Sequence, residues 1–241
     1  MQTDTKNNTI ISKTSINRLI RDVKDMQDKT LPSSGIYYKH DDTDMLTGYA
    51  LIIGPRDTPY FGGYYFFTFH FPPTYPMDPP VVTYETNKDN IRFHPNFYRT
   101  GKICISLLNT WNGEQWSACQ NIKSVLLTIC SLFDNEPLLN EPGITKTSSD
   151  LKPYYEIVKF ANLKIAILDV LNRNILHEWC DRFADVINSS FYENKEQILC
   201  FYETNFNNPC LLLTTIIYRM KIQIDYDELK QELIIIKNEI I

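Results

Sequence analysis

Residues 62–71 read GGYYFFTFHF, and a run so rich in aromatic side chains predicts a β-strand. Three more runs rich in aromatic or β-branched residues lie on either side of it: IYYKH at 36–40, MLTGYALIIG at 45–54 and VVTYET at 81–86. Turn residues separate the four runs at 41–44, 54–63 and 72–80. Connections this short join antiparallel neighbours, so we expect a four-stranded antiparallel meander sheet.

Helical periodicity appears before and after these strands. At the N-terminal end, apolar residues recur at helical spacing behind Thr14 or Ser15, either of which suits a cap: Ile16, Leu19, Ile20, Val23 and Met26. The solvent face of this helix is expected to carry these charged residues: Lys13, Arg18, Arg21, Lys24, Asp22 and Asp25. Residues 122–133 are apolar on most sides, which predicts a central buried helix covering the sheet.

The remainder of the chain is predicted to be helical, at about 150–172, 173–203 and 224–241. Strands followed by helices are typical of an α+β fold. The expected organisation is a flexible N-terminal tail at 1–13, a core at 14–160 and a helical C-terminal extension at 161–241.

Composition narrows the class of protein. With 43% hydrophobic and 22% charged residues, the 241-residue chain has the composition of a globular protein. The longest apolar stretch, residues 211–220, is far short of the roughly 20 residues that span a bilayer, so no membrane partner is expected. A net charge of −5 argues against a nucleic-acid partner. The polar N-terminus has no signal-peptide pattern, so we expect a cytoplasmic or nuclear protein with reduced thiols.

Residues 87–120 form a long irregular stretch, and such stretches in compact domains usually carry function. Cys104 stands in this stretch eight positions after Asn96. A cysteine hydrolase would pair Cys104 with His94, but His94 directly precedes Pro95, where the backbone is restricted and the residue commonly holds a bend. A Cys-His hydrolase is therefore disfavoured.

No metal site or cofactor is expected. The six cysteines include no C-x-x-C pair, and neither glycine-rich phosphate-loop pattern occurs. His177 and Cys180 lie three positions apart, but one such pair without two further ligands is usually a packing feature.

Taken together, several segments resemble the catalytic core of ubiquitin-conjugating enzymes in order and spacing: TSINRLIRDVKDMQ at 14–27, PYFGGYYFFTFHFPPTYPMDPPVVTY at 59–84, FHPNFYRTGKICISLL at 93–108, WSACQNIKSVLLTICSLF at 116–133 and NEPG at 140–143. The His94-Pro95-Asn96 triplet with its cysteine eight residues beyond the asparagine is the most specific part. The segment YYEIVKFANLKIAILDVLNRN and the helical tail are similar to the large Z-type branch.

The resemblance implies an α/β core with a four-stranded antiparallel sheet, and it implies that Cys104 accepts ubiquitin or a related modifier as a thioester from an activating enzyme. It implies that Asn96 donates to the oxyanion of the tetrahedral intermediate or braces the loop, and that His94, Pro95 and Trp116 are structural. Thiol exchange needs no extreme thiolate, which suits an exposed Cys104. Asn140 and Glu141 match the place beside the incoming lysine, with the assignment between them open.

The resemblance also implies partner surfaces. Met77, Ala118 and Cys119 match the ligase-binding positions, where the family's Pro-Ala pair is replaced by Ala118-Cys119, so the choice of ligase is open. Arg18 and Arg21 match the basic positions that meet the activating enzyme. The chief alternative is a non-catalytic ubiquitin-interaction scaffold with the same fold. Members of the scaffold class lack the cysteine, whereas this chain has it, which favours the enzyme. The resemblance to a conjugating enzyme implies protein substrates.

Overall fold

The predicted sheet is present, with its strands in the order β1-β2-β3-β4 and every neighbour antiparallel. Its strands are β1 (Ile36–His40), β2 (Thr47–Ile53), β3 (Tyr64–His70) and β4 (Val81–Tyr84). The structure is a computed structural model that describes residues 11–174 and 177–239, so most of the predicted tail at 1–13 lies outside the described residues. The glycine and methionine residues at the ends of the predicted runs, Met45, Gly54, Gly62 and Gly63, lie outside the strands.

Both faces of β3 are buried, which explains why its sequence is continuously apolar rather than alternating. On the inner face Tyr65 packs on Phe133, with ring centroids 4.6 Å apart, and Phe67 packs on Phe97. On the outer face Phe66 meets Trp179 edge to face at 5.8 Å. The aromatic run therefore joins two layers that lie on opposite sides of the sheet.

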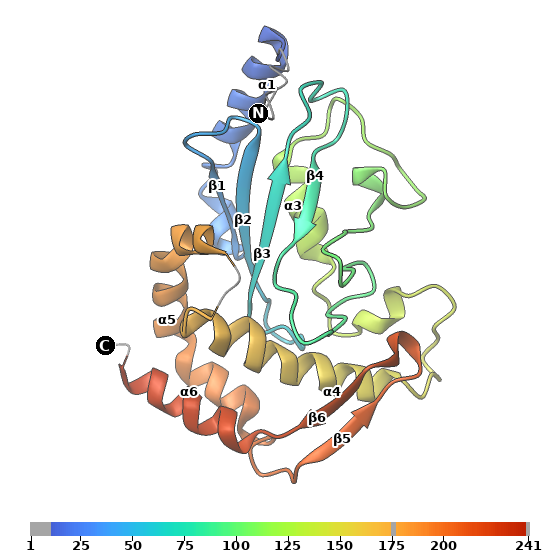
Figure 1. The fold of residues 1–241 in the computed structure, drawn as a ribbon, viewed down its shortest axis with the longest axis vertical. Helices are drawn as coiled ribbons and strands as arrows, with labels where there is room; N and C mark the ends of the chain where they lie inside the picture. Colours follow the sequence, from blue (N-terminus) through green and yellow to red (C-terminus); the bar gives the residue numbers. More distant parts are fainter. Residues whose placement is uncertain (1–10, 175–176, 240–241) are drawn as a thin grey trace, which may run out of the picture.

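Helix α3 (Ile122–Ser131) covers the inner face, behind the sheet in Figure 1. It begins at Asn121, whose side chain accepts from the Ser124 N–H in a capping box. The predicted central helix is buried against the sheet at Ile122, Val125, Leu126 and Ile129, whereas Leu127 is exposed. Short helices complete the core: α2 (Thr30–Ser33), η1 (Ser106–Leu108) and η2 (Pro137–Asn140).

Helix α1 (Lys13–Asp25) begins earlier than predicted, because its cap lies two positions before Thr14 and three before Ser15. Ser12 is the cap, and its hydroxyl accepts from the Ser15 N–H at 3.0 Å. The expectation that Asp22 faces solvent is also wrong, because Asp22 is buried and accepts from the Tyr75 hydroxyl. Its partner is 53 residues away, so helical periodicity alone gave no sign of this contact.

The C-terminal part contains strands that the sequence did not predict. The elements are α4 (Leu151–Ala161), the π-helix η3 (Asn162–Asp169), the 3-10 helix η4 (Glu178–Phe183), α5 (Ala184–Glu203), β5 (Leu211–Thr214), η5 (Ile217–Arg219), β6 (Lys221–Ile224) and α6 (Asp227–Glu239). One helix is predicted over residues 173–203, but the chain forms the 3-10 helix η4 first, and α5 covers only the later part of this range. Strands β5 and β6 pair as an antiparallel hairpin.

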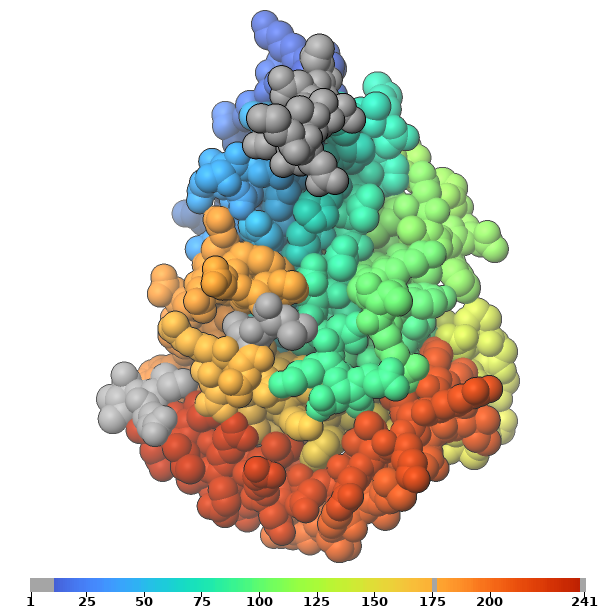
Figure 2. Space-filling view, viewed as in Figure 1, coloured from blue at the N-terminus to red at the C-terminus, as the bar shows by residue number. Residues whose placement is uncertain are grey.

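The extension packs beneath and beside the core. Helix α4 crosses the lower end of the sheet in Figure 1, with the β5–β6 hairpin and α6 beneath it. Figure 2 shows the orange and red residues forming the lower end of the molecule. Helical structure runs from Leu151 to Val170 through the predicted boundary after residue 160, and the division into domains remains a prediction. Over the described residues, no helix combines the length and apolarity needed to cross a membrane.

A buried asparagine joins the core to the extension. Asn162 is fully buried, accepts from the Tyr65 hydroxyl, and donates to the Phe61 carbonyl at 2.9 Å and to the Tyr202 hydroxyl at 2.9 Å. A Cβ at Gly63, directly before β3, would lie 1.9 Å from the Asn162 side-chain oxygen, so this position favours glycine. This network ties β3 to the first residue of η3 and to α5.

We expect Asn162→Ala to lower the free energy of unfolding by about 3 kcal/mol, because it leaves the buried Phe61 carbonyl and Tyr65 hydroxyl without their partner. Urea unfolding measures the loss. Asn188→Ala, at an exposed position on α5, is the control and should change stability by less than about 0.5 kcal/mol. Equal effects of the two substitutions would contradict the assigned role of Asn162.

Candidate active site

Cys104 and Asn96 hold each other's backbone. The Cys104 N–H donates to the Asn96 carbonyl at 2.9 Å, and the Asn96 side-chain amide donates to the Cys104 carbonyl. Ile103 and Ile105, on either side of the cysteine, are both buried. The position of Cys104 is therefore fixed by two hydrogen bonds to one residue and by two apolar anchors.

The loop after Cys104 is fixed by a threonine. The Thr110 hydroxyl lies 2.8 Å from the Ile103 carbonyl and accepts from the Ile105 N–H at 3.0 Å. Asn109 adopts a left-handed conformation with φ of 56°, and its side-chain oxygen accepts from the Trp116 N–H. The chain thus folds back on itself directly after the candidate nucleophile.

The prediction of an exposed Cys104 is wrong, because the residue is only 4% exposed, although its thiol is free of any disulfide. The reason is local: the Asn96 segment and the Thr110 turn both pack against the residues next to it. Little of the Cys104 residue is therefore accessible in this conformation.

Of the two roles that the sequence left open for Asn96, the brace is visible in the structure. Its amide nitrogen carries two hydrogens, and one is donated to the Cys104 carbonyl. The second hydrogen leaves the oxyanion role chemically available. Either role keeps Asn96 in direct contact with the cysteine.

His94 is not a base for Cys104. It is fully buried, and burial, with a smaller contribution from the nearby Arg92 charge, lowers the pKa of His94 to about 3. Its Nδ1 accepts from the Asn96 N–H at 3.0 Å, and its Nε2 has no partner. The imidazole thus contacts the Asn96 backbone, and the carbonyl of the buried Pro95 accepts from Arg92 at 2.6 Å; both contacts fit the predicted structural role.

Trp116 joins the two loops that carry the predicted ligase-binding residues. Its indole N–H donates to the Pro76 carbonyl at 2.8 Å, next to Met77, which is 72% exposed. Ala118 and Cys119 follow on the other loop, with Ala118 half-buried and Cys119 exposed. These positions form part of the accessible surface.

The two predicted arginines differ in environment. Arg18 lies with its Nε 2.8 Å from both carboxylate oxygens of Asp22, and it donates to the Ala118 and Gln120 carbonyls. Its side chain is only 13% exposed, so the expectation that Arg18 faces solvent is wrong. Arg21, by contrast, is 66% exposed. Arg18 connects α1 to the 118–120 loop, and Arg21 presents its charge to solvent.

Asn140 and Glu141 both make contacts within the protein. Asn140 donates to the Asp134 carboxylate at 2.8 Å. The Glu141 carboxylate accepts from the hydroxyl of Tyr218, which lies in the turn of the β5–β6 hairpin. Sequence reasoning missed Tyr218, because residues 211–220 were recognised only as an apolar run.

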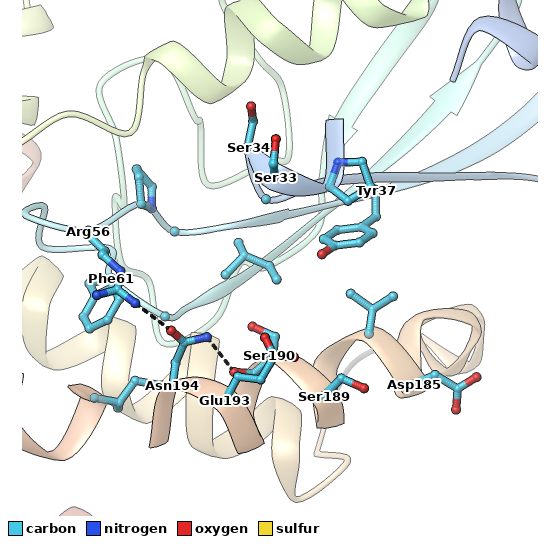
Figure 3. Close-up of a pocket in the computed structure, with 18 residues that line it drawn as sticks. Ser33, Ser34, Tyr37, Arg56, Phe61, Asp185, Ser189, Ser190, Glu193 and Asn194 are labelled. Atoms are coloured by element: carbon cyan, nitrogen blue, oxygen red, sulfur yellow. Dashed lines mark hydrogen bonds between the residues drawn. The ribbon is translucent and has the colours of Figure 1, made fainter. Parts of the chain in front are cut away.

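The large hollow drawn in Figure 3, about 630 Å³, lies between α5 and the end of the sheet. Its lining includes Tyr37, Arg56, Ser190 and Glu193, and Cys104 is not part of it. The large cavity and the candidate thiol site are therefore different places in this fold.

The sequence predicts that His177 and Cys180 are a packing feature and not part of a metal site. Within the described ranges 11–174 and 177–239, no group of three or more potential ligands converges on a metal position. Burial, followed by the charge of Glu85, raises the pKa of the Cys180 thiol to about 12. His177 lies 3.2 Å from the Glu85 carboxylate. The pair fits a packing role.

A sequence model of the family described as "Ubiquitin-conjugating enzyme" matches residues 18–160. The Xenopus tropicalis protein named "Ubiquitin-conjugating enzyme E2 Z" is 39% identical over 77% of this chain and 58% of its own length. The Homo sapiens protein of the same name is 42% identical over 64% of this chain and 44% of its own length. The chain thus spans about half the length of these curated relatives.

The buried imidazole predicts a specific pH dependence. Because the pKa of His94 is lowered from 6.5 to about 3, the unfolded chain gains a proton below about pH 6.5 that the folded chain does not. The contribution of His94 to the free energy of unfolding is fully present above pH 6.5. Between pH 6.5 and pH 3 it falls with decreasing pH by up to about 1.4 kcal/mol per pH unit.

Urea unfolding of the parent and of His94→Asn at pH 7 and pH 5.5 measures this difference. We expect His94→Asn to have a lower free energy of unfolding than the parent at pH 7. Between pH 7 and pH 5.5, however, this free energy should fall by about 1 kcal/mol less in the variant than in the parent. His70→Asn, at an exposed position, is the control and should lose as much as the parent. Identical losses in His94→Asn and the parent would show that His94 titrates in the folded state.

Proposed function

The chain belongs to the ubiquitin-conjugating enzyme family, with Z-type relatives, and from this premise we propose that it is an active conjugating enzyme whose acceptor thiol is Cys104. The observation that carries the proposal is the reciprocal hydrogen bonding between Asn96 and Cys104. A scaffold that only binds ubiquitin needs neither the thiol nor its amide partner. The scaffold alternative is therefore not favoured.

The first step is a thiol exchange. The Cys104 sulfur attacks the carbonyl of the modifier's C-terminal thioester on the activating enzyme, forming a new C–S bond. The old C–S bond breaks, the activating enzyme's thiol leaves, and the Cys104 proton is passed to it through solvent. ATP is consumed earlier by the activating enzyme, so this chain needs no nucleotide site or cofactor.

The second step transfers the modifier to an amine or to a ligase thiol. A lysine nitrogen attacks the thioester carbonyl, a C–N bond forms, and the C–S bond to Cys104 breaks. The nitrogen loses a proton to a carboxylate or to water, and the Cys104 thiolate regains one. We assign the carboxylate role to Glu141 rather than to Asn140, because an amide cannot accept this proton.

Partner surfaces follow from exposure and charge. Arg21 offers a basic contact for an acidic face of the activating enzyme, and Arg18 fixes the helix that presents it. The exposed Met77, with Ala118 and Cys119, offers a surface to a ligase. We place this activity in the cytoplasm or nucleus, where thiols stay reduced.

Cys104 is expected to be the only cysteine that charging requires. With activating enzyme, ATP and ubiquitin, the parent should form an adduct that reductant removes. Cys104→Ser should give a reductant-resistant ester or none, since an oxygen ester is not cleaved by thiols. Cys119→Ser, the exposed control, should charge at the parent's rate. A reductant-sensitive adduct on Cys104→Ala would overturn the assignment.

Asn96 is expected to act mainly after charging. Removing one oxyanion donor typically slows transfer by roughly 100-fold to 1,000-fold, so Asn96→Ala should charge yet lose most discharge to free lysine. Single-turnover pulse-chase of preformed thioester measures this, with thermal melting alongside. If discharge falls only in step with lost folding, Asn96 serves the structure solely as a brace.

A further inference from the structure

The turn of the β5–β6 hairpin contacts both segments that carry candidate catalytic residues. The Tyr218 hydroxyl donates to Glu141, and the Tyr218 carbonyl accepts from the Arg99 guanidinium at 2.8 Å. The Arg92 N–H donates to the Met220 sulfur at 3.4 Å. One short turn of the extension therefore bridges the loop at 134–149 and the segment at 92–99.

The conformation of this turn is unusual. Tyr218 and Arg219 both adopt positive φ values, 58° and 49°, although neither is glycine. A left-handed conformation costs a non-glycine residue roughly 1 kcal/mol or more, so surrounding contacts must hold it in place. One such contact is the Ile217 N–H, which donates to the buried Asp150 carboxylate at 2.7 Å.

Arg92 connects the Tyr218 ring to the His-Pro-Asn segment. The buried guanidinium carbon lies 3.7 Å from the centre of the Tyr98 ring and 5.0 Å from the centre of the Tyr218 ring. The same guanidinium donates to the Pro95 carbonyl at 2.6 Å. A shift of the Tyr218 ring would therefore reach the residue that precedes Asn96.

The hydroxyl of Tyr218 is a fixed donor. Burial, followed by the hydrogen bond to Glu141, raises the pKa of Tyr218 far above its ordinary value, so the phenol stays protonated at every working pH. The Glu141 carboxylate is consequently held by a neutral donor that does not compete for its charge. A carboxylate held in this way keeps one orientation toward whatever approaches it.

We propose that Tyr218 is a positioning residue for transfer of the modifier to an amine. Its hydroxyl orients Glu141, and its ring and carbonyl fix the 92–99 segment through Arg92 and Arg99; we name these four residues the turn clamp. The inference rests on the proposed function, because it assigns the clamp to the amine step of that reaction. It gives the C-terminal hairpin a part in catalysis without contact with the substrate.

Tyr218→Phe tests the hydroxyl while retaining the ring. Single-turnover discharge of preformed Cys104 thioester should slow about tenfold at low lysine concentration, the effect of losing one hydrogen bond to a charged group. The main change should be a higher lysine concentration at half-maximal rate, because a freely rotating Glu141 orients the ammonium less well. Charging by the activating enzyme should change less than about twofold.

A double-mutant cycle with Glu141→Gln tests the route of the effect. If Tyr218 acts through Glu141, the double variant should discharge no more slowly than Glu141→Gln alone. Multiplied defects, or parent-like discharge in Tyr218→Phe, would overturn the proposal. Tyr192→Phe, an exposed tyrosine on α5, is the matched control and should discharge like the parent.

A second readout is independent of activity. Lys146 lies in the loop that begins at Glu141, and its side chain is 78% exposed, so trypsin cleavage there reports opening of the loop. Tyr218→Phe should be cut several-fold faster than the parent, and Tyr192→Phe at the parent's rate. Failure of the parent to charge would overturn the proposed function alone; equal cleavage of Tyr218→Phe and the parent would overturn the clamp.

Discussion

The mutual hydrogen bonds between Asn96 and Cys104 are the constraint on which the rest of the site depends. The two residues lie eight positions apart, and the chain between them returns so that each residue satisfies a backbone group of the other. His94 supports this arrangement by accepting the Asn96 N–H at its Nδ1, and its burial, with the nearby Arg92 charge, lowers the pKa of the imidazole. The backbone of Cys104 is therefore held in place before any exchange begins.

The second constraint is that the sheet is buried on both faces. Phe66 and its outer-face neighbours need a cover, and the extension supplies it through Trp179 and Phe183. Once the extension is anchored there and at Asn162, its chain runs along α4 and its hairpin turn meets the segment that precedes Cys104. Packing of the sheet and positioning of the site are therefore linked through one continuous C-terminal chain.

Much of the core could be predicted because its signals are local. Aromatic runs divided by Gly and Pro placed all four strands within about two residues, and the motif spacing pointed to Cys104 and Asn96. The failures have different causes: Asp22 is buried because Tyr75, 53 residues away, approaches it, whereas Cys104 is covered by neighbouring loops whose turn, at Thr110, gives no recognisable sequence pattern. The β5–β6 hairpin lacked an Asn-Gly or Asp-Gly turn, since Tyr218 and Arg219 take the left-handed positions instead.

The contacts that join the hairpin turn to the 92–99 segment, and that segment to Cys104, predict that the turn and the Cys104 segment open as one unit. Native-state hydrogen exchange of the full chain tests it by comparing the Cys104 amide, bonded to Asn96, with the Ile217 and Met220 amides in the turn. The account predicts opening free energies that agree within about 1 kcal/mol across the three amides. Rapid exchange of the two turn amides beside a Cys104 amide that stays protected would contradict it.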